Sequence, residues 1–78
     1  MPPTYPLNQL PRGQRAVVCH LDTQGAMRRR LQDIGLRPGA AVQTLFCSCC
    51  GDPVAYLIGG AVIALRRCDA ATVMVHPG

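Results

Sequence analysis

Three cysteines lie close together in the sequence, at Cys47, Cys49 and Cys50. Thiolates are preferred ligands of zinc, so this stretch is a candidate metal site. Its C-x-C-C spacing differs from the C-x-x-C of zinc knuckles and disulfide oxidoreductases. A fourth ligand would come from a second copy of the chain or from another part of this one: Cys19, His20, Cys68 or His76. The alternative interpretation is a set of incidental free thiols, with Cys19 as a small core residue.

Iron(II) proteins usually present carboxylates and imidazoles, and this chain has four aspartates, no glutamate and two histidines. We expect Asp52, which sits inside a turn, to bond backbone amides and not a metal, and Asp33 to pair with Arg37 or to cap local backbone. The sequence therefore predicts no iron site and no required cofactor. Any bound divalent metal is expected to be zinc, at the cysteine stretch.

Arginines form two groups, Arg28 to Arg30 and Arg66 to Arg67. Three consecutive residues cover almost a full helical turn, so the first group cannot face one way. Guanidinium groups bind oxyanions in a bidentate manner, which suits an acidic patch or a nucleotide phosphate on a partner protein. The alternative is a solvated helix face with weak arginine–aspartate pairs.

Catalytic and nucleic-acid-binding patterns are missing from the sequence. We find no nucleophile–base pair, and Gly59-Gly60 precedes no helix that would make it a phosphate-binding loop. With 4% aromatic residues, no tryptophan and a net charge of only +4, a base-stacking surface is disfavoured. We predict neither enzymatic activity nor nucleic-acid binding.

Short apolar runs between glycines and prolines predict five strands, over residues 16–21, 41–46, 54–58, 61–65 and 71–75. Apolar residues at helical spacing predict one helix over 26–34, ended by Gly35, and Gly59-Gly60 predicts a hairpin turn. In the connection 66–70, we expect Asp69 to cap a helical turn. Short strands around one short helix indicate a mainly β, strongly bent small barrel.

The length of 78 residues allows one domain, spanning 1–78. The 49% of hydrophobic residues exclude an intrinsically disordered chain. No signal peptide is visible at the start. The longest apolar run, over 54–65, is shorter than the roughly 20 residues that span a bilayer. We predict a cytoplasmic protein without direct membrane insertion.

The run from Met27 to Gly39 resembles the helix and turn of the ferrous iron transport protein A (FeoA) family. Other pieces follow the order of the family, and together they extend the resemblance over about residues 6–76. They are Leu7…Leu10-x-x-Gly13, the turn Gly51-Asp52-Pro53, the strand end Ala64-Leu65-Arg66, and Asp69-Ala70 before a valine-rich strand.

The resemblance implies an SH3-like barrel of about five strands with one short α-helix. It also implies a non-catalytic accessory protein of bacterial ferrous iron uptake. Such a protein would bind and modulate the membrane iron transporter that carries a cytosolic GTP-binding domain. A similar barrel occurs in iron-dependent repressors, so the fold alone does not define function. The chief alternative is a protein that senses or buffers a divalent metal through Cys47, Cys49 and Cys50.

The sequence departs from the family where Cys49-Cys50 replaces a usual Pro-Leu, and where Leu57 and Val62 occupy positions that often carry charge. The apolar hairpin over 54–65 exceeds what a short barrel can bury, so we expect it to pack on the transporter or on a second copy in a homodimer. Our candidate partner-binding residues are Arg28, Arg30, Leu57 and Arg66.

Overall fold

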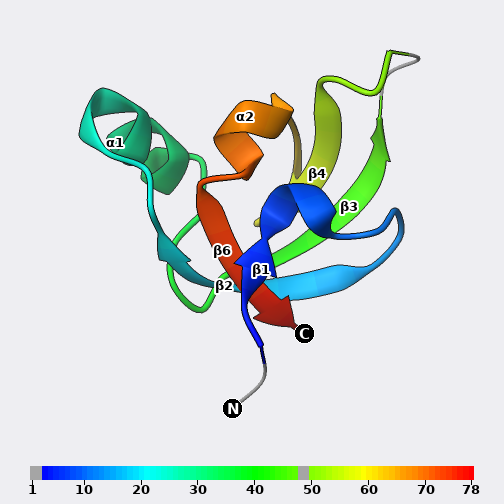
Figure 1. Cartoon of the computed structure of the whole chain (residues 1–78), viewed down its shortest axis with the longest axis horizontal. Coiled ribbons are helices and arrows are strands. Elements are labelled where there is room, and N and C mark those ends of the chain that lie inside the picture. The colour runs from blue at the N-terminus through cyan, green and yellow to red at the C-terminus, as the bar shows by residue number, and fades with distance from the viewer. Residues whose placement is uncertain (1–2, 48–49) are drawn as a thin grey trace.

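The computed structural model describes residues 3–47 and 50–78. Within this part of the chain the fold is mainly β, with short helices at one end (Figure 1). The strands are β1 (Tyr5–Pro6), β2 (Arg15–Leu21), β3 (Ala41–Cys47), β4 (Val54–Ile58), β5 (Ala61–Leu65) and β6 (Val73–Pro77). The helices are the 3-10 turn η1 (Leu7–Gln9), α1 (Gly25–Asp33) and α2 (Arg67–Ala70).

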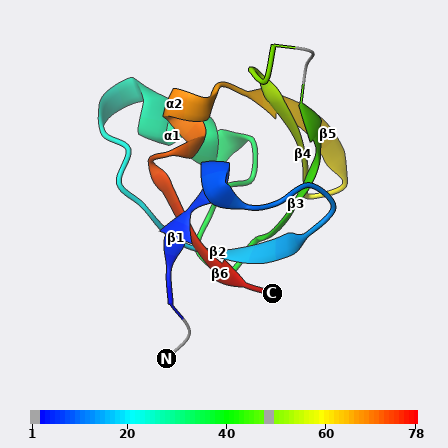
Figure 2. The same cartoon turned by 45° about the vertical axis from the view of Figure 1, so that its right-hand side comes forward.

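The six strands form one antiparallel sheet in the order β1-β6-β2-β3-β4-β5. The sheet is strongly bent, so that β3, β4 and β5 turn away from β1 and β6 (Figure 2). It stays open, with β1 and β5 as its edges. The expected small SH3-like fold is confirmed. The strand missing from our count is β1, which has only two residues and depends on its pairing with β6.

The β4–β5 hairpin has the predicted boundaries. Gly59 and Gly60 connect the strands with φ values of +57° and +84°. A two-residue hairpin turn with positive φ at both positions matches the twist of the flanking strands, and glycine adopts it without a steric cost. Two consecutive glycines between β-branched runs therefore defined this element correctly.

Irregular pairing shifts the alternation of side chains in β2 and β3. Between Val18 and His20 the register to β6 slips, which leaves Cys19 as an extra residue in β2. A bulge of this kind moves the following residues to the other face. Cys19 is consequently half-buried, whereas Val18 and Leu21 are both buried. Our expectation of a core cysteine is met only in part, because Cys19 follows buried Val18 on the opposite face of the strand, and the bulge returns Leu21, not Cys19, to the core face.

Helix α1 ends in a Schellman motif, as Gly35 at φ +109° allows. The amide of Leu36 donates to the Leu31 carbonyl at 3.0 Å, and the amide of Gly35 donates to the Gln32 carbonyl at 3.0 Å. Leu31 and Leu36 are fully buried, while Met27 and Ile34 pack against the core from the same helix. This nine-residue helix is too short to persist alone, so its stability comes from packing.

The helical turn α2 is capped differently from our prediction. Its flanking residue Arg66 provides no side-chain cap, and Asp69 lies inside the helix. The amide of Arg67 instead donates to Asp52 Oδ1 at 2.8 Å, and Arg67 Nε donates to the Gly51 carbonyl at 2.6 Å. The prediction of Asp69 as the cap is wrong, because the capping acceptor, Asp52, comes from a loop fifteen residues before Arg67.

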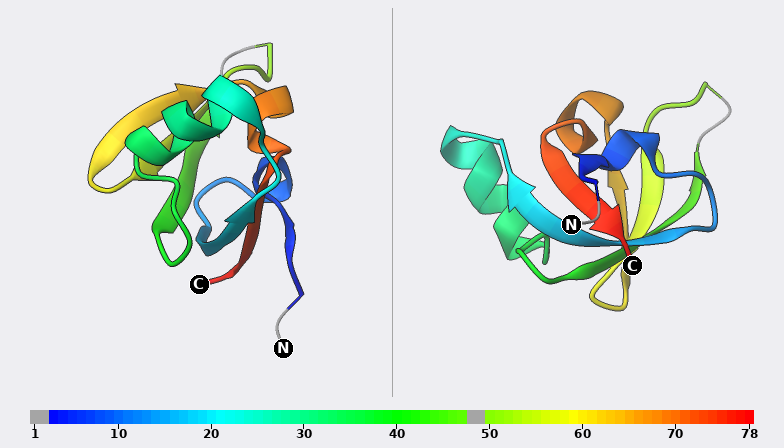
Figure 3. Two further views of the ribbon diagram at one scale, coloured as in Figure 1. Left: turned by 90° about the vertical axis from the view of Figure 1, so that its left-hand side faces the viewer. Right: turned by 60° about the horizontal axis from the view of Figure 1, so that its bottom comes forward.

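Strand β1 near the start of the described chain and strand β6 near its end lie side by side, away from α1 and α2 (Figures 1 and 3). This follows from the antiparallel pairing of β1 with β6, in which Tyr5 stands opposite Val75. None of the helices in the described part of the chain has the length and apolar character that a membrane span requires.

Candidate functional site

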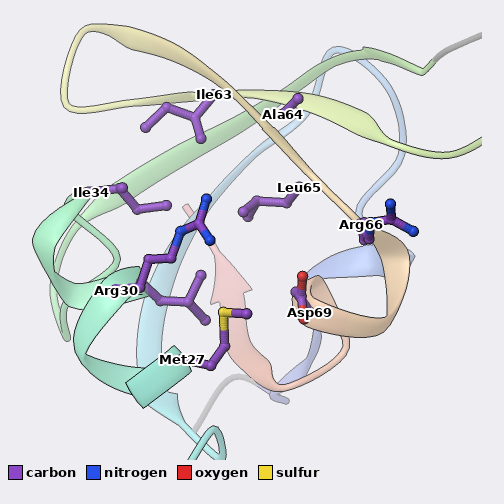
Figure 4. A pocket seen from close by; sticks show the side chains of 9 residues that line it. Met27, Arg30, Ile34, Ile63, Ala64, Leu65, Arg66 and Asp69 are labelled. Atoms are coloured by element: carbon purple, nitrogen blue, oxygen red, sulfur yellow. The ribbon is translucent and has the colours of Figure 1, made fainter.

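A groove of about 370 Å³ lies between α1, β5 and α2 (Figure 4). We call it the α1–β5 groove. Its lining is mostly apolar, with three polar side chains that belong to three different segments. The lining residues are Met27, Arg30, Leu31, Ile34, Ile63, Ala64, Leu65, Arg66 and Asp69.

The repeat of the helix explains how α1 lines one wall. Met27, Leu31 and Ile34 are spaced by four and three residues, so they share one face. Arg30 is three residues after Met27 and four before Ile34, which places it beside the same stripe. Figure 4 shows its side chain extending from α1 toward the β5 side of the groove. The sequence therefore builds an apolar wall with a cation at its rim.

Strand β5 supplies the facing wall. Ile63 and Leu65 alternate onto the same face of the sheet, and Leu65 is buried whereas Ile63 is half-buried. Arg66 follows directly after the strand and is exposed. The groove thus has an apolar floor and two cationic side chains on its border, Arg30 and Arg66.

The charges around the groove are not neutralised internally. Neither Arg30 nor Arg66 forms an ion pair with a carboxylate of the described residues. Asp69 is half-buried, and its Oδ1 accepts only a weak contact from Cys68 Sγ at 3.9 Å. Unpaired guanidinium groups beside an apolar surface suit a ligand that carries both an apolar group and an oxyanion.

The structure brings together two of the four predicted partner-binding residues. Arg30 and Arg66, far apart in the sequence, both line the α1–β5 groove. Arg28 is exposed on α1 and does not line it. Leu57 is half-buried and lines a separate cavity of about 180 Å³ beside Arg15. Our sequence reasoning found the two arginines but could not see the groove between them.

The two described members of the predicted metal site lie in and beside the β3–β4 connection, outside the α1–β5 groove. Cys47, at the end of β3, and Cys50 are exposed free thiols. Cys49 lies outside the described residues. In residues 3–47 and 50–78, no three histidine, cysteine, aspartate or glutamate side chains gather as a metal site would require.

Of the two aspartates whose contacts we predicted, one behaves as expected and the other does not. Asp52 accepts a backbone amide, as expected. The predicted pair of Asp33 with Arg37 is wrong, because Arg37 Nε donates to the Gln32 carbonyl at 3.1 Å and no Asp33–Arg37 ion pair forms. The backbone carbonyl at the end of α1 attracts this guanidinium in place of the carboxylate.

Comparison with known protein families gives a match over almost the whole chain. Residues 5–77 match the model of the FeoA domain. The chain belongs to the FeoA family. The match confirms the resemblance drawn from the sequence, and the family is linked to ferrous iron transport.

Three known proteins show how similar this FeoA-family chain is to other members. The Fe(2+) transport protein A/Fe(2+) transporter FeoB fusion protein of Porphyromonas gingivalis is 33% identical over 70 residues, which are 90% of this chain and 8% of that protein. The solution structure of FeoA from Chlorobium tepidum is 36% identical with a TM-score of 0.87, over 92% of this chain and 69% of the other. FeoA from Stenotrophomonas maltophilia is 30% identical with a TM-score of 0.80, over 90% of this chain and 87% of the other.

Proposed function

We propose that this protein is a cytoplasmic, non-catalytic accessory protein of bacterial ferrous iron uptake. It binds the cytosolic portion of the GTP-binding iron transporter and modulates it. The observation that carries this proposal is the Porphyromonas gingivalis relative, in which a domain similar to 90% of this chain is part of one polypeptide with the transporter. Domains that are fused in one organism commonly interact as separate chains in another.

We propose the α1–β5 groove as the docking surface. Burial of an apolar side chain against Leu31, Ile63 and Leu65 would supply the hydrophobic part of the binding free energy. The guanidinium groups of Arg30 and Arg66 favour a carboxylate next to that side chain. The partner segment is therefore an exposed stretch of the transporter with an apolar residue beside an aspartate or glutamate.

The test is calorimetric titration of the reduced, chelator-treated protein into the purified cytosolic portion of the transporter from its own organism. We expect saturable binding without added metal. Arg30→Ala and Arg66→Ala should each weaken it about fivefold or more, since truncation of an anchoring arginine commonly costs over 1 kcal/mol. Arg28→Ala is the matched control, because Arg28 lies on the same helix outside the groove.

Equal losses of binding affinity in Arg30→Ala, Arg66→Ala and Arg28→Ala would indicate a diffuse electrostatic contact and not docking to the α1–β5 groove. Absence of binding, with and without ferrous iron or zinc, would contradict docking to this portion. GTP hydrolysis by the same portion, measured with and without the accessory protein, tests modulation separately. If the rate of GTP hydrolysis is unchanged at saturating accessory protein, the protein would bind the transporter without regulating its hydrolysis of GTP.

A second candidate function is thiolate binding of zinc by Cys47, Cys49 and Cys50. One observation favours it: the relative from Stenotrophomonas maltophilia is described as a complex with zinc. The two described thiols are exposed and free to bind a metal. Zinc titration against a colorimetric chelator should give stoichiometric uptake that is lost on replacing the three cysteines with serine and retained in Cys19→Ser. Uptake that survives the triple replacement would exclude this stretch as the site.

A further inference from the structure

A further pocket, of about 270 Å³, shares no lining residue with the α1–β5 groove. It lies where η1 and the turn after it meet β3 and β4, with Arg67 beside them. We call it the Tyr56 pocket. Its lining residues are Asn8, Gln9, Leu10, Pro11, Arg12, Thr44, Cys47, Val54, Tyr56 and Arg67.

Tyr56 is the unusual member of this set. Its side chain is only 1% exposed, yet its hydroxyl has no hydrogen-bond partner among the described residues. No side-chain oxygen or nitrogen in that part of the chain is both inaccessible and unpaired, so the Tyr56 hydroxyl must be the atom that still reaches open space. The space that Tyr56 lines is this pocket. A phenol in such a position is an unused donor, because buried tyrosine hydroxyls usually find a partner.

Arg12 and Arg67 line the same space, and none of its described lining residues is a carboxylate, although the Asp52 carboxylate acts on Tyr56 from outside this lining. Arg67 is held in place by the bond from its Nε to the Gly51 carbonyl, which leaves its terminal N–H groups free of the described residues. Arg12 is exposed at the border. Thr44 donates its hydroxyl to the Leu10 carbonyl at 3.3 Å and so fixes the turn that carries Arg12.

We propose that Tyr56, Arg12 and Arg67 form a binding site for a small oxyanion, a phosphate or carboxylate group. One neutral donor and two cationic side chains around one pocket match the several lone pairs of such a group. The cavity is smaller than typical sites for drug-sized ligands, which favours a single anionic group or a small metabolite that carries one. Burial raises the pKa of Tyr56, Arg67 partly counters that effect, and the Asp52 carboxylate adds to it. Because the pKa stays raised, the phenol remains a donor at neutral pH.

The experiment is a ¹⁵N NMR titration of the reduced protein with inorganic phosphate and, in a parallel arm, with acetate. Ionic strength is held constant with sodium chloride. We expect saturable shifts at Leu10, Thr44 and Tyr56 in at least one arm, and the stronger arm identifies the oxyanion. Tyr56→Phe and Arg12→Gln should weaken binding roughly tenfold, the size of one hydrogen bond to a charged group. Tyr5→Phe and Arg28→Gln are the matched controls.

Absence of saturable shifts in both arms would overturn the site, as would equal weakening by Arg12→Gln and Arg28→Gln, which would indicate general charge attraction. Cys47 gives a second readout in the unmodified protein, because its thiol lines the same pocket. Its alkylation by iodoacetamide, followed by peptide mass mapping, should slow at saturating anion, while alkylation of Cys68 should not. Unprotected Cys47 would contradict occupancy of the pocket.

Discussion

At the residue scale, Gly35 shows how one backbone position supports the groove. Its φ of +109° ends α1, and a Cβ placed there would lie 3.1 Å from Ile58 Cγ2 on β4. A side chain at this position is therefore strained by its backbone and also pressed against the core. The close approach of helix to sheet depends on the missing side chain.

We expect Gly35→Ala to lower the free energy of unfolding by about 1–3 kcal/mol. Gly39→Ala is the matched control, since Gly39 also has a positive φ, of +90°, but nothing within 4 Å of its added Cβ. Urea unfolding followed by circular dichroism measures both. Equal losses would show that the contact with Ile58 contributes nothing beyond backbone strain.

Tyr56 predicts a pH dependence of stability. Burial raises the pKa of its phenol above the ordinary value of 10.0. The neutral, protonated form is the one favoured by the fold, so the folded chain holds this proton more tightly than the unfolded chain. The associated stability is fully present below about pH 10 and is lost as pH rises through the folded pKa.

Absorbance at 295 nm in a Tyr5→Phe variant isolates Tyr56, and we expect its titration midpoint above pH 10. The Tyr56→Phe variant should lose less stability than the unmodified protein between pH 10 and the folded pKa. A midpoint at or below pH 10 would contradict the buried environment that we describe.

At the element scale, α2 depends on a partner from outside its own segment. A four-residue helix gains little from its internal hydrogen bonds, and the Asp52 carboxylate satisfies its first amide. Together with the Arg67–Gly51 bond, this contact ties the β3–β4 connection to the segment that follows β5. The same contacts connect the α1–β5 groove and the Tyr56 pocket, because Arg66 lines the groove and its neighbour Arg67 lines the pocket.

We expect Asp52→Ala to destabilise the fold by roughly 0.5–2 kcal/mol, in the range of a lost helix cap. Asp52→Asn keeps an acceptor oxygen and should lose less. Asp33→Ala, at the exposed end of α1, serves as the control for removal of a carboxylate. Thermal unfolding of the three variants measures the difference, and an Asp52→Asn loss as large as that of Asp52→Ala would show that charge, not hydrogen bonding, stabilises α2.

Local signals in the sequence were enough for the hairpin 54–65 and for α1. Two adjacent glycines, β-branched residues and a helical repeat of apolar residues act within a few positions of one another. The local signals failed to predict β1, whose two residues form a strand only because β6 lies beside them. They also failed for the α2 cap, since Asp52 and Arg67 meet only after the sheet has formed. Contacts between distant segments leave no local pattern.

The same reason limits prediction of the sites at the scale of the whole molecule. Arg30 and Arg66 were identified by residue type, but the groove exists only where α1, β5 and α2 converge. The Tyr56 pocket was not predicted at all. A single tyrosine in an apolar strand indicates a core residue. That its hydroxyl shares a pocket with Arg12 and Arg67 is known only from the fold.

The free edge of the sheet bears on the expected homodimer. Strand β5 pairs only with β4 and contains no charge and no proline, which are the usual features that keep edge strands apart. Val62 on this edge is 62% exposed. We expect two copies to pair through β5 at high concentration and Val62→Lys to shift them to monomers.

Sedimentation velocity over a range of concentrations measures this equilibrium. Phe46→Lys is the control, because Phe46 is similarly exposed but lies on β3, inside the sheet. A monomer at every concentration would exclude the homodimer. An equal effect of both lysine variants would assign the association to general stickiness and not to the edge.

The pairing of β1 with β6 also determines how this domain can be tethered. The described N-terminal residues that lead into β1 and the residues that follow β6 leave the fold together, on the side of the molecule away from α1 and α2 (Figures 1 and 3). A linker attached at either end would leave the α1–β5 groove facing outward, so the order of two fused domains need not alter what the groove can reach. Only the length of the linker would then set the effective concentration of the groove near its target.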